Sequence, residues 1–278
     1  GIVLGVNTTA HNNRVHDIGY DGSYASAIAP LNGADGQTIT NNTIYRTGRS
    51  SIDLMESQDV EIGYNEMYDF GMLNNDLGAV YAARGVDLTG TRIHHNWIHD
   101  HRASDSSIGS NTGIYFDQNA GPAQVDHNVI WFDDGGSRTG DLYVKHGLDD
   151  GTDLREFSHL IYNNTFASTG VQYSYKNSNN TQTTVFDIMK NNVFRDEFQI
   201  TYIAQTPPGT NSLYLSTNPL FTNSGAGGLK FRLQSGSPAI DAGAAVSGVT
   251  DGYAGSAPDI GAYEYGGTDW VPGYVAPP

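Results

Sequence analysis

Short stretches of alternating hydrophobic and polar residues recur along the chain, separated by Gly, Asn and Asp. One phrase, an Asn followed by such a stretch, recurs at steps of 23 to 36 residues. The residues that open it are Asn13, Asn42, Asn65, Asn96, Asn128, Asn164 and Asn192. A repeat of this size predicts stacked units that bury their apolar faces against their neighbours. We expect each Asn to adopt the left-handed conformation at a turn, with its amide bonded along the stack.

A second alternating stretch lies upstream of most of these Asn residues, and a third comes just before the Asn. The second stretches are 52–56, 80–84, 114–118, 142–146 and 173–177. Two or three short strands per repeat predict an all-β chain folded as a right-handed parallel β-helix. Alternation directs the first and third residue of each stretch inward. The predicted inward columns are Ile52, Val80, Ile114, Leu142, Tyr173 and Leu54, Ala82, Phe116, Val144, Tyr175.

The repeat becomes weaker after Asn192, and the chain becomes rich in Gly and Pro. We therefore expect β-helix coils over residues 1–217 and leave open whether further coils precede them. Residues 218–278 should form a last coil, a cap over the open end of the core and an extended tail, because the end of a solenoid needs a cover.

Composition limits the partners of this chain of 278 residues. Its formal charge of −16 disfavours nucleic acid and anionic membranes. It contains no Cys and no run of eighteen apolar residues, so we expect neither disulfides nor a membrane span. The acidic composition, rich in Gly, Asn and Thr, is typical of secreted bacterial proteins. We expect a secreted or periplasmic monomer that binds a polysaccharide or oligosaccharide.

Stacking should bring outward residues of neighbouring coils to about 4.8 Å from each other, so outward columns can be deduced as well. The first is Asp53, Tyr81, Tyr115, Tyr143, Ser174. The next two are Met55, Ala83, Asp117, Lys145, Lys176 and Glu56, Arg84, Gln118, His146, Asn177. A solvated face would carry mostly Thr, Ser, Asn and Lys, whereas this one mixes aromatic, acidic and basic residues. The mixture predicts a functional face.

Two acids on this face suggest chemistry. Asp76 precedes one strand stretch, Asp117 ends the next, and they are 41 residues apart, close to one coil plus a short offset. They could therefore lie across one cleft. Paired carboxylates serve glycosidases, in which one donates a proton and the other attacks or activates water. The structural alternatives are an Asx-turn for Asp76 and an ion pair of Asp117 with Lys145 or Arg84.

The phrases DLGAVY and GIYFDQ, each followed by RIHHNWIHD or QVDHNVIW, resemble right-handed β-helix glycoside hydrolases. They are most similar to glycoside hydrolase family 141, of fucosidase and xylanase type, with family 120 as a cousin. The resemblance covers roughly residues 10–200 and implies that Asp76 and Asp117 are the catalytic pair. We expect the substrate-binding residues to be Glu56, Tyr81, Arg84, Tyr115, Gln118, Tyr143, Lys145, His146 and Lys176.

Two other classes of function stay open. A β-helix polysaccharide lyase or epimerase would use Lys, Arg or His as a base beside a uronate carboxylate, with Ca²⁺ to neutralise that carboxylate. Residues 133–135 and 149–153 could hold such an ion, although acidic turns are more often simply solvated. A non-enzymatic adhesin or phage fibre would need no acid pair. We expect no required cofactor and no metal at His94, His95, His99 and His101, because alternation sends neighbouring side chains to opposite faces.

Overall fold

The computed structural model describes the chain in ten ranges: 1–21, 24–102, 111–133, 140–146, 157–169, 171–177, 187–195, 197–201, 209–210 and 218–277. Within them the strands are short, as the closely spaced Gly, Asn and Asp residues predicted, and every pair of neighbouring strands in the sheets is parallel.

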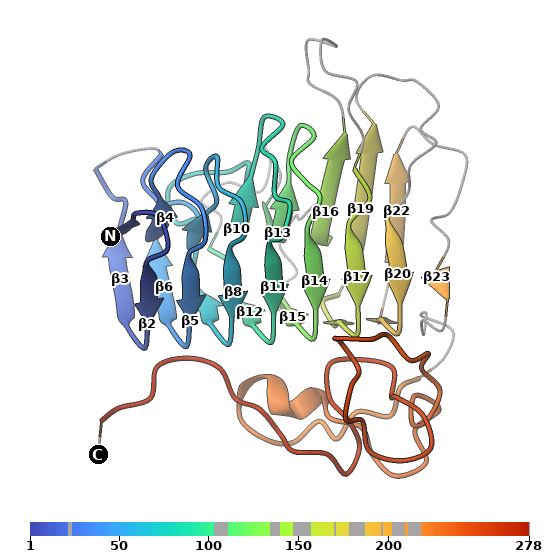
Figure 1. Cartoon of the computed structure of the whole chain (residues 1–278). Coiled ribbons are helices and arrows are strands. Elements are labelled where there is room, and N and C mark those ends of the chain that lie inside the picture. Colours follow the sequence, from blue (N-terminus) through green and yellow to red (C-terminus); the bar gives the residue numbers. More distant parts are fainter. Residues whose placement is uncertain are drawn as a thin grey trace.

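Three parallel sheets run the length of the molecule (Figure 1). Sheet 1 contains β1 (Ile2–Leu4), β4 (Ile28–Pro30), β7 (Ile52–Asp53), β10 (Leu77–Ala82), β13 (Asn111–Phe116), β16 (Gly140–His146), β19 (Val171–Asn177) and β22 (Glu197–Thr201). Sheet 2 contains β2 (Thr9–His11), β5 (Thr38–Thr40), β8 (Glu61–Gly63), β11 (Arg92–His94), β14 (Gln124–Asp126), β17 (Leu160–Tyr162), β20 (Ile188–Lys190) and β23 (Gly209–Thr210). Sheet 3 contains β3 (Arg14–Ile18), β6 (Thr43–Thr47), β9 (Glu66–Tyr68), β12 (Trp97–His99), β15 (Val129–Trp131), β18 (Thr165–Phe166) and β21 (Val193–Phe194).

Each strand pairs with the strand three places later in the chain, so one coil contributes one strand to each sheet. This arrangement is the predicted all-β parallel β-helix. The register is also the predicted one in sheet 1. The inward column pairs Ile52 with Val80, Ile114, Leu142 and Tyr173 in turn, and all five side chains are fully buried. The hydrophobic core therefore runs as continuous columns along the helix axis.

The seven recurring Asn residues form a ladder of side-chain amides. From Asn42 to Asn192, each amide oxygen accepts a hydrogen bond from the amide group of the Asn one coil before it, at 2.9–3.1 Å. The predicted stack is therefore confirmed. The left-handed backbone was predicted at the Asn itself, and this was wrong by one residue. The residue before each ladder Asn adopts that conformation, as at Tyr64 (φ 55°) and His95 (φ 52°).

The C-terminal segment, residues 218–277, covers a flank of the helix and not the open end of its core as we expected (Figure 1). Its apolar side chains, Phe231 and Tyr263 among them, pack against Trp97 and Trp131 on the outer face of sheet 3. It includes the 3₁₀ helix η1 (Gly227–Phe231). The physical reason is that outward Trp side chains on sheet 3 offer apolar area that water would otherwise contact. Within the described ranges, no helix is long and apolar enough to cross a membrane.

The final stretch of the chain runs back along the helix to the first coil (Figure 1). The backbone N–H of Tyr274 donates to the Thr43 hydroxyl at 2.8 Å, and that of Val275 donates to the Asn12 amide oxygen at 2.7 Å. The tail thus lies along the surface of the β-helix.

Candidate active site

A cleft of about 810 Å³ opens on the outer face of sheet 1. It extends over four neighbouring coils, those of β4, β7, β10 and β13, which spans roughly 14 Å along the helix axis at about 4.8 Å per coil. Its lining residues are Tyr24, Asn32, Arg49, Asp53, Met55, Glu56, Asn74, Asn75, Asp76, Tyr81, Ala83, Arg84, Val86, Asp117 and Gln118. Both predicted catalytic acids therefore face one cleft, and the cleft is predominantly polar.

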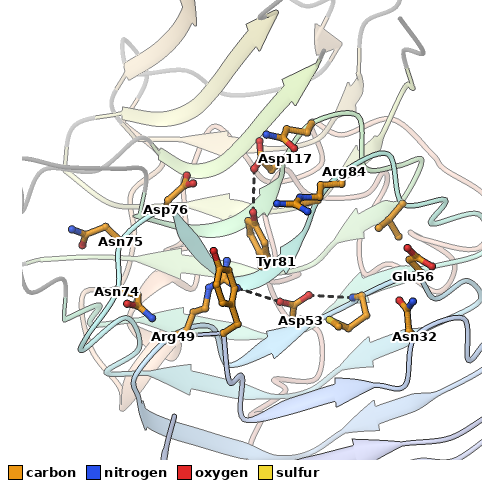
Figure 2. Close-up of a pocket in the computed structure, with 15 residues that line it drawn as sticks. Asn32, Arg49, Asp53, Glu56, Asn74, Asn75, Asp76, Tyr81, Arg84 and Asp117 are labelled. Atoms are coloured by element: carbon orange, nitrogen blue, oxygen red, sulfur yellow. Dashed lines mark hydrogen bonds and ion pairs between the residues drawn. The ribbon is translucent and has the colours of Figure 1, made fainter. Parts of the chain in front are cut away.

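Asp117 is held from two sides. It directly follows β13 and is 3% exposed. The Tyr81 hydroxyl donates a hydrogen bond to its Oδ2 at 3.1 Å (Figure 2), and the Lys145 ammonium lies 3.2 Å from its Oδ1. The ion pair with Lys145 that we considered as a structural alternative is thus present. The same contacts orient the carboxylate, so they are compatible with a structural and with a chemical role.

Asp76 lies at the other end of the sheet, directly before β10. Its φ of 61° is in the left-handed region, which Asp tolerates better than most residues. The Asn111 amide, from the next coil, donates to the neighbouring Asn75 side chain at 3.2 Å and so ties this turn to the sheet.

The charges of both acids act on Tyr81. Burial raises the pKa of its phenol, and the negative charges of Asp117 and Asp76 raise that pKa further. The two carboxylates come from opposite ends of neighbouring strands, yet both act on this one hydroxyl. Asp76 and Asp117 are separated in the sequence by one coil plus a short offset. That offset corresponds to the length of a strand, because Asp76 precedes β10 and Asp117 follows β13.

Sequence reasoning missed a second charged pair in the cleft. Asp53 lies beside Tyr81 in the register of β7 and β10, and its carboxylate is 3.7 Å from the guanidinium of Arg49. Burial raises the pKa of Asp53, although the Met55 N–H and the Arg49 charge oppose this shift. Asp53 belongs to one of the predicted outward columns, so its position in the cleft could have been predicted from the sequence. Arg49 lies outside the repeated stretches, and no signal marks it.

Three of the predicted binding residues, Glu56, Arg84 and Gln118, line the cleft at the carboxyl end of sheet 1. Arg84 (φ 60°) and Gln118 (φ 50°) adopt the left-handed conformation, and the N–H of the residue after Arg84 donates to the Gln118 carbonyl at 2.7 Å. Such conformations in residues other than Gly are uncommon and often occur at functional sites. The turns that carry these two side chains are therefore fixed by the stacking of their coils.

Four other predicted binding residues do not line the cleft. Tyr115 and Tyr143 are only 2% and 4% exposed, because the rings stack along the column at 4.6 Å and only the Tyr81 end of that column reaches the cleft. Lys145 is buried beside Asp117, in the next coil, and His146 is 2% exposed. The remaining predicted residue, Lys176, pairs with Lys145 along the backbone, and its side chain is outside the described part of the structure.

Of the four histidines considered for a metal, His95 lies near two other side chains that could act as metal ligands. Its ring nitrogens lie within 4.8 Å of possible ligand atoms of Asp126 and His127. However, the rings of His95 and His127 stack face to face at 4.7 Å, so their in-plane lone pairs do not converge. Arg92 also binds both oxygens of Asp126 at 2.8 Å. Ring stacking and this ion pair account for the cluster.

The residues proposed for Ca²⁺, 134–135 and 149–153, lie outside the described residues. Asp133, at the edge of the first group, is described, and its carboxylate accepts a hydrogen bond from Lys230 at 3.1 Å.

Comparison with known proteins supports the fold. A solved structure titled pectate lyase Pel9A superposes with a TM-score of 0.50 at 17% sequence identity. The match covers 92% of this chain and 65% of the lyase, so the chain spans about two thirds of that protein's length. No protein-family model matches the sequence, and no curated protein matches it significantly. At this identity, the likeness shows a shared parallel β-helix and leaves the activity to be argued from the site.

Proposed function

We propose that this protein is a carbohydrate-active enzyme that hydrolyses glycosidic bonds of a polysaccharide outside the cell. The observation that carries the proposal is the meeting of Asp76 and Asp117 in one polar cleft, with Asp117 held by Tyr81 and Lys145. A cleft open along several coils suits a chain-like substrate. The phrases that contain both acids, similar to glycoside hydrolase family 141, support the same reaction.

The contacts of Asp117 suit the carboxylate that attacks the anomeric carbon or removes a proton from water. One donor approaches each of its oxygens, and these two contacts fix the direction of the carboxylate. A second carboxyl group must then protonate the glycosidic oxygen as the bond to the anomeric carbon breaks. Asp76 is the other member of the pair expected from the sequence, so it is the first candidate for this role. Asp53 is a second candidate, because burial raises its pKa, as expected for a proton donor.

Substitution of the three acids tests the proposal. The purified protein is assayed for new reducing ends with xylan, arabinan, xyloglucan and other neutral polysaccharides. Asp117→Asn should lower kcat by at least about 10³-fold, and the variant of the proton donor, Asp76→Asn or Asp53→Asn, should lower it by about 10²–10⁴-fold. Asp251→Asn, an exposed acid in the C-terminal segment, is the matched control and should keep full activity. Activity that survives both Asp117→Asn and Asp76→Asn would reject the proposed pair.

A polysaccharide lyase is the second candidate, supported by the shared fold with a pectate lyase and by a basic side chain, Lys145, that contacts Asp117 although it does not itself line the cleft. In such a reaction Lys145 would remove the proton beside a uronate carboxyl group, and the leaving sugar would depart with formation of a C=C bond. The ion pair with Asp117 argues against this, since it stabilises the proton that a base must first lose. An unsaturated, ultraviolet-absorbing product from polygalacturonate, formed with Ca²⁺ and lost in Lys145→Ala, would establish the lyase instead. Binding without any turnover would favour the adhesin.

A further inference from the structure

Tyr24 lies at the cleft in a position that packing alone does not explain. It is 80% exposed, more than any other large hydrophobic side chain among the described residues. Most exposed aromatic residues in this structure lie away from the cleft, whereas Tyr24 is one of its lining residues. An aromatic ring left in water at the edge of a polar cleft has apolar area available for a ligand.

The ring of Tyr24 is supported from one side. The Arg49 guanidinium lies over it at 4.9 Å from the ring centre, and over the Tyr81 ring at 4.8 Å. Arg49 is itself only 7% exposed and pairs with Asp53. A planar guanidinium stacks on aromatic faces in a way that an ammonium does not. Arg49 thus holds Tyr24 in line with Tyr81, whose hydroxyl contacts Asp117, and the exposed side of Tyr24 stays accessible.

From this arrangement we infer that Tyr24, supported by Arg49, is a stacking platform for one pyranose ring of a neutral glycan, in a subsite next to the acid pair. The C–H face of a sugar packs on an aromatic face, and amide and carboxylate groups can bond its hydroxyls. Asn32, Asn74 and Glu56 line the same cleft and supply such groups. The inference rests on the proposed function and adds a substrate class and a specificity residue to it.

Charge selects the neutral glycan over a uronate. The described lining residues carry four carboxylates, Asp53, Glu56, Asp76 and Asp117, and two guanidinium groups, Arg49 and Arg84. Two of these carboxylates are already paired, Asp53 with Arg49 and Asp117 with Lys145, which leaves Glu56 and Asp76 facing Arg84 alone. A uronate carboxylate stacked on Tyr24 would therefore meet excess negative charge, whereas a neutral sugar would not.

The inference is tested by binding in the Asp117→Asn background, so that it does not depend on turnover. Binding is measured by calorimetry, with xylohexaose, cellohexaose and mannohexaose as neutral pyranose probes and hexagalacturonate as the anionic probe. At least one neutral probe should bind more tightly than hexagalacturonate. Adding Tyr24→Ala should weaken that binding about tenfold, the effect of roughly 1.4 kcal/mol of lost ring stacking. Tyr24→Phe should stay within about twofold of the parent, because the ring face is kept.

Tyr253→Ala, an exposed tyrosine of the C-terminal segment, is the control and should bind like the parent. In the active enzyme, Tyr24→Ala should raise KM and leave kcat nearly unchanged. Three results would overturn the inference: no neutral probe binds, hexagalacturonate binds best, or Tyr24→Ala binds as tightly as the parent. Failure of the proposed hydrolysis is recognised separately, because it abolishes turnover and leaves the Tyr24-dependent binding intact.

Discussion

Replacing Asn96 by Ala tests whether the amide ladder stabilises the helix. The Asn96 side chain makes four hydrogen bonds inside the molecule. Its amide donates to the Ile62 carbonyl at 3.0 Å and to the Asn128 oxygen at 2.9 Å. Its oxygen accepts from the backbone and the side chain of Asn65, at 2.8 and 3.1 Å. Asn96 is fully buried, so Ala would leave these partners without water to replace the lost bonds.

The expected loss follows from those partners. A buried polar group without a partner costs about 1–3 kcal/mol, and some relaxation is expected, so we estimate about 4 kcal/mol for Asn96→Ala. Asn13→Ala is the matched control at the end of the ladder. The Asn13 side chain donates only to the His11 carbonyl and to Asn42 among the described residues, and it is partly exposed. Its loss should cost about 1 kcal/mol, because water can take over these contacts.

Equilibrium urea unfolding followed by far-ultraviolet circular dichroism measures both variants, with the free energy of unfolding extrapolated to water. We expect Asn96→Ala to lose about 3 kcal/mol more than Asn13→Ala. Equal losses within about 0.5 kcal/mol would refute the reasoning, because Asn96 is fully buried and makes more hydrogen bonds than Asn13, and neither difference would then affect stability.

Three further predictions concern other parts of the molecule. Burial raises the pKa of Asp187 to about 7, so the folded state binds the proton of this carboxyl group more tightly than the unfolded chain does. The protonated carboxyl group therefore stabilises the fold fully below pH 3.8, and this stabilisation is lost as the pH rises to about 7. Asp187→Asn should therefore flatten the pH dependence of the urea midpoint over this interval. Gly273 has φ +100°, and a Cβ there would lie 2.8 Å from the Thr43 hydroxyl, so Gly273→Ala should cost about 1–2 kcal/mol and speed amide exchange in the tail. Trp97→Phe removes the bond from its ring N–H to the Tyr263 hydroxyl at 2.9 Å and should lower the unfolding free energy by about 1–2 kcal/mol; an unchanged value would mean that this contact is not stabilising.

Much of the fold could be predicted from the sequence because its constraint is periodic. In a parallel stack, each residue contacts its counterpart one coil away, so a column such as Ile52, Val80 and Ile114 must be apolar throughout. The same periodicity placed Asp53, Tyr81 and Tyr115 in one outward column. It did not show that the Tyr115 ring would be covered by its neighbours, because ring stacking within a column depends on side-chain directions.

The candidate site was predictable only in part, for the same reason. Asp117 lies one residue beyond a strand, where the register of the coils still applies. Tyr24, Arg49 and Asn74 lie in the connections between strands, whose lengths and sequences vary from coil to coil. No periodic constraint acts on such segments, and contacts with other coils determine where their side chains point.

The sequence by itself thus determined the stacked all-β coils, the apolar columns and the Asn ladder, since all three follow from a local pattern repeated at nearly constant spacing. The tertiary structure decided the rest. It brought Tyr24 and Arg49 over sheet 1 beside Asp53, and it placed the C-terminal segment along the flank of sheet 3. These contacts join segments far apart in the chain, and their energy depends on shapes that appear only when the coils have stacked.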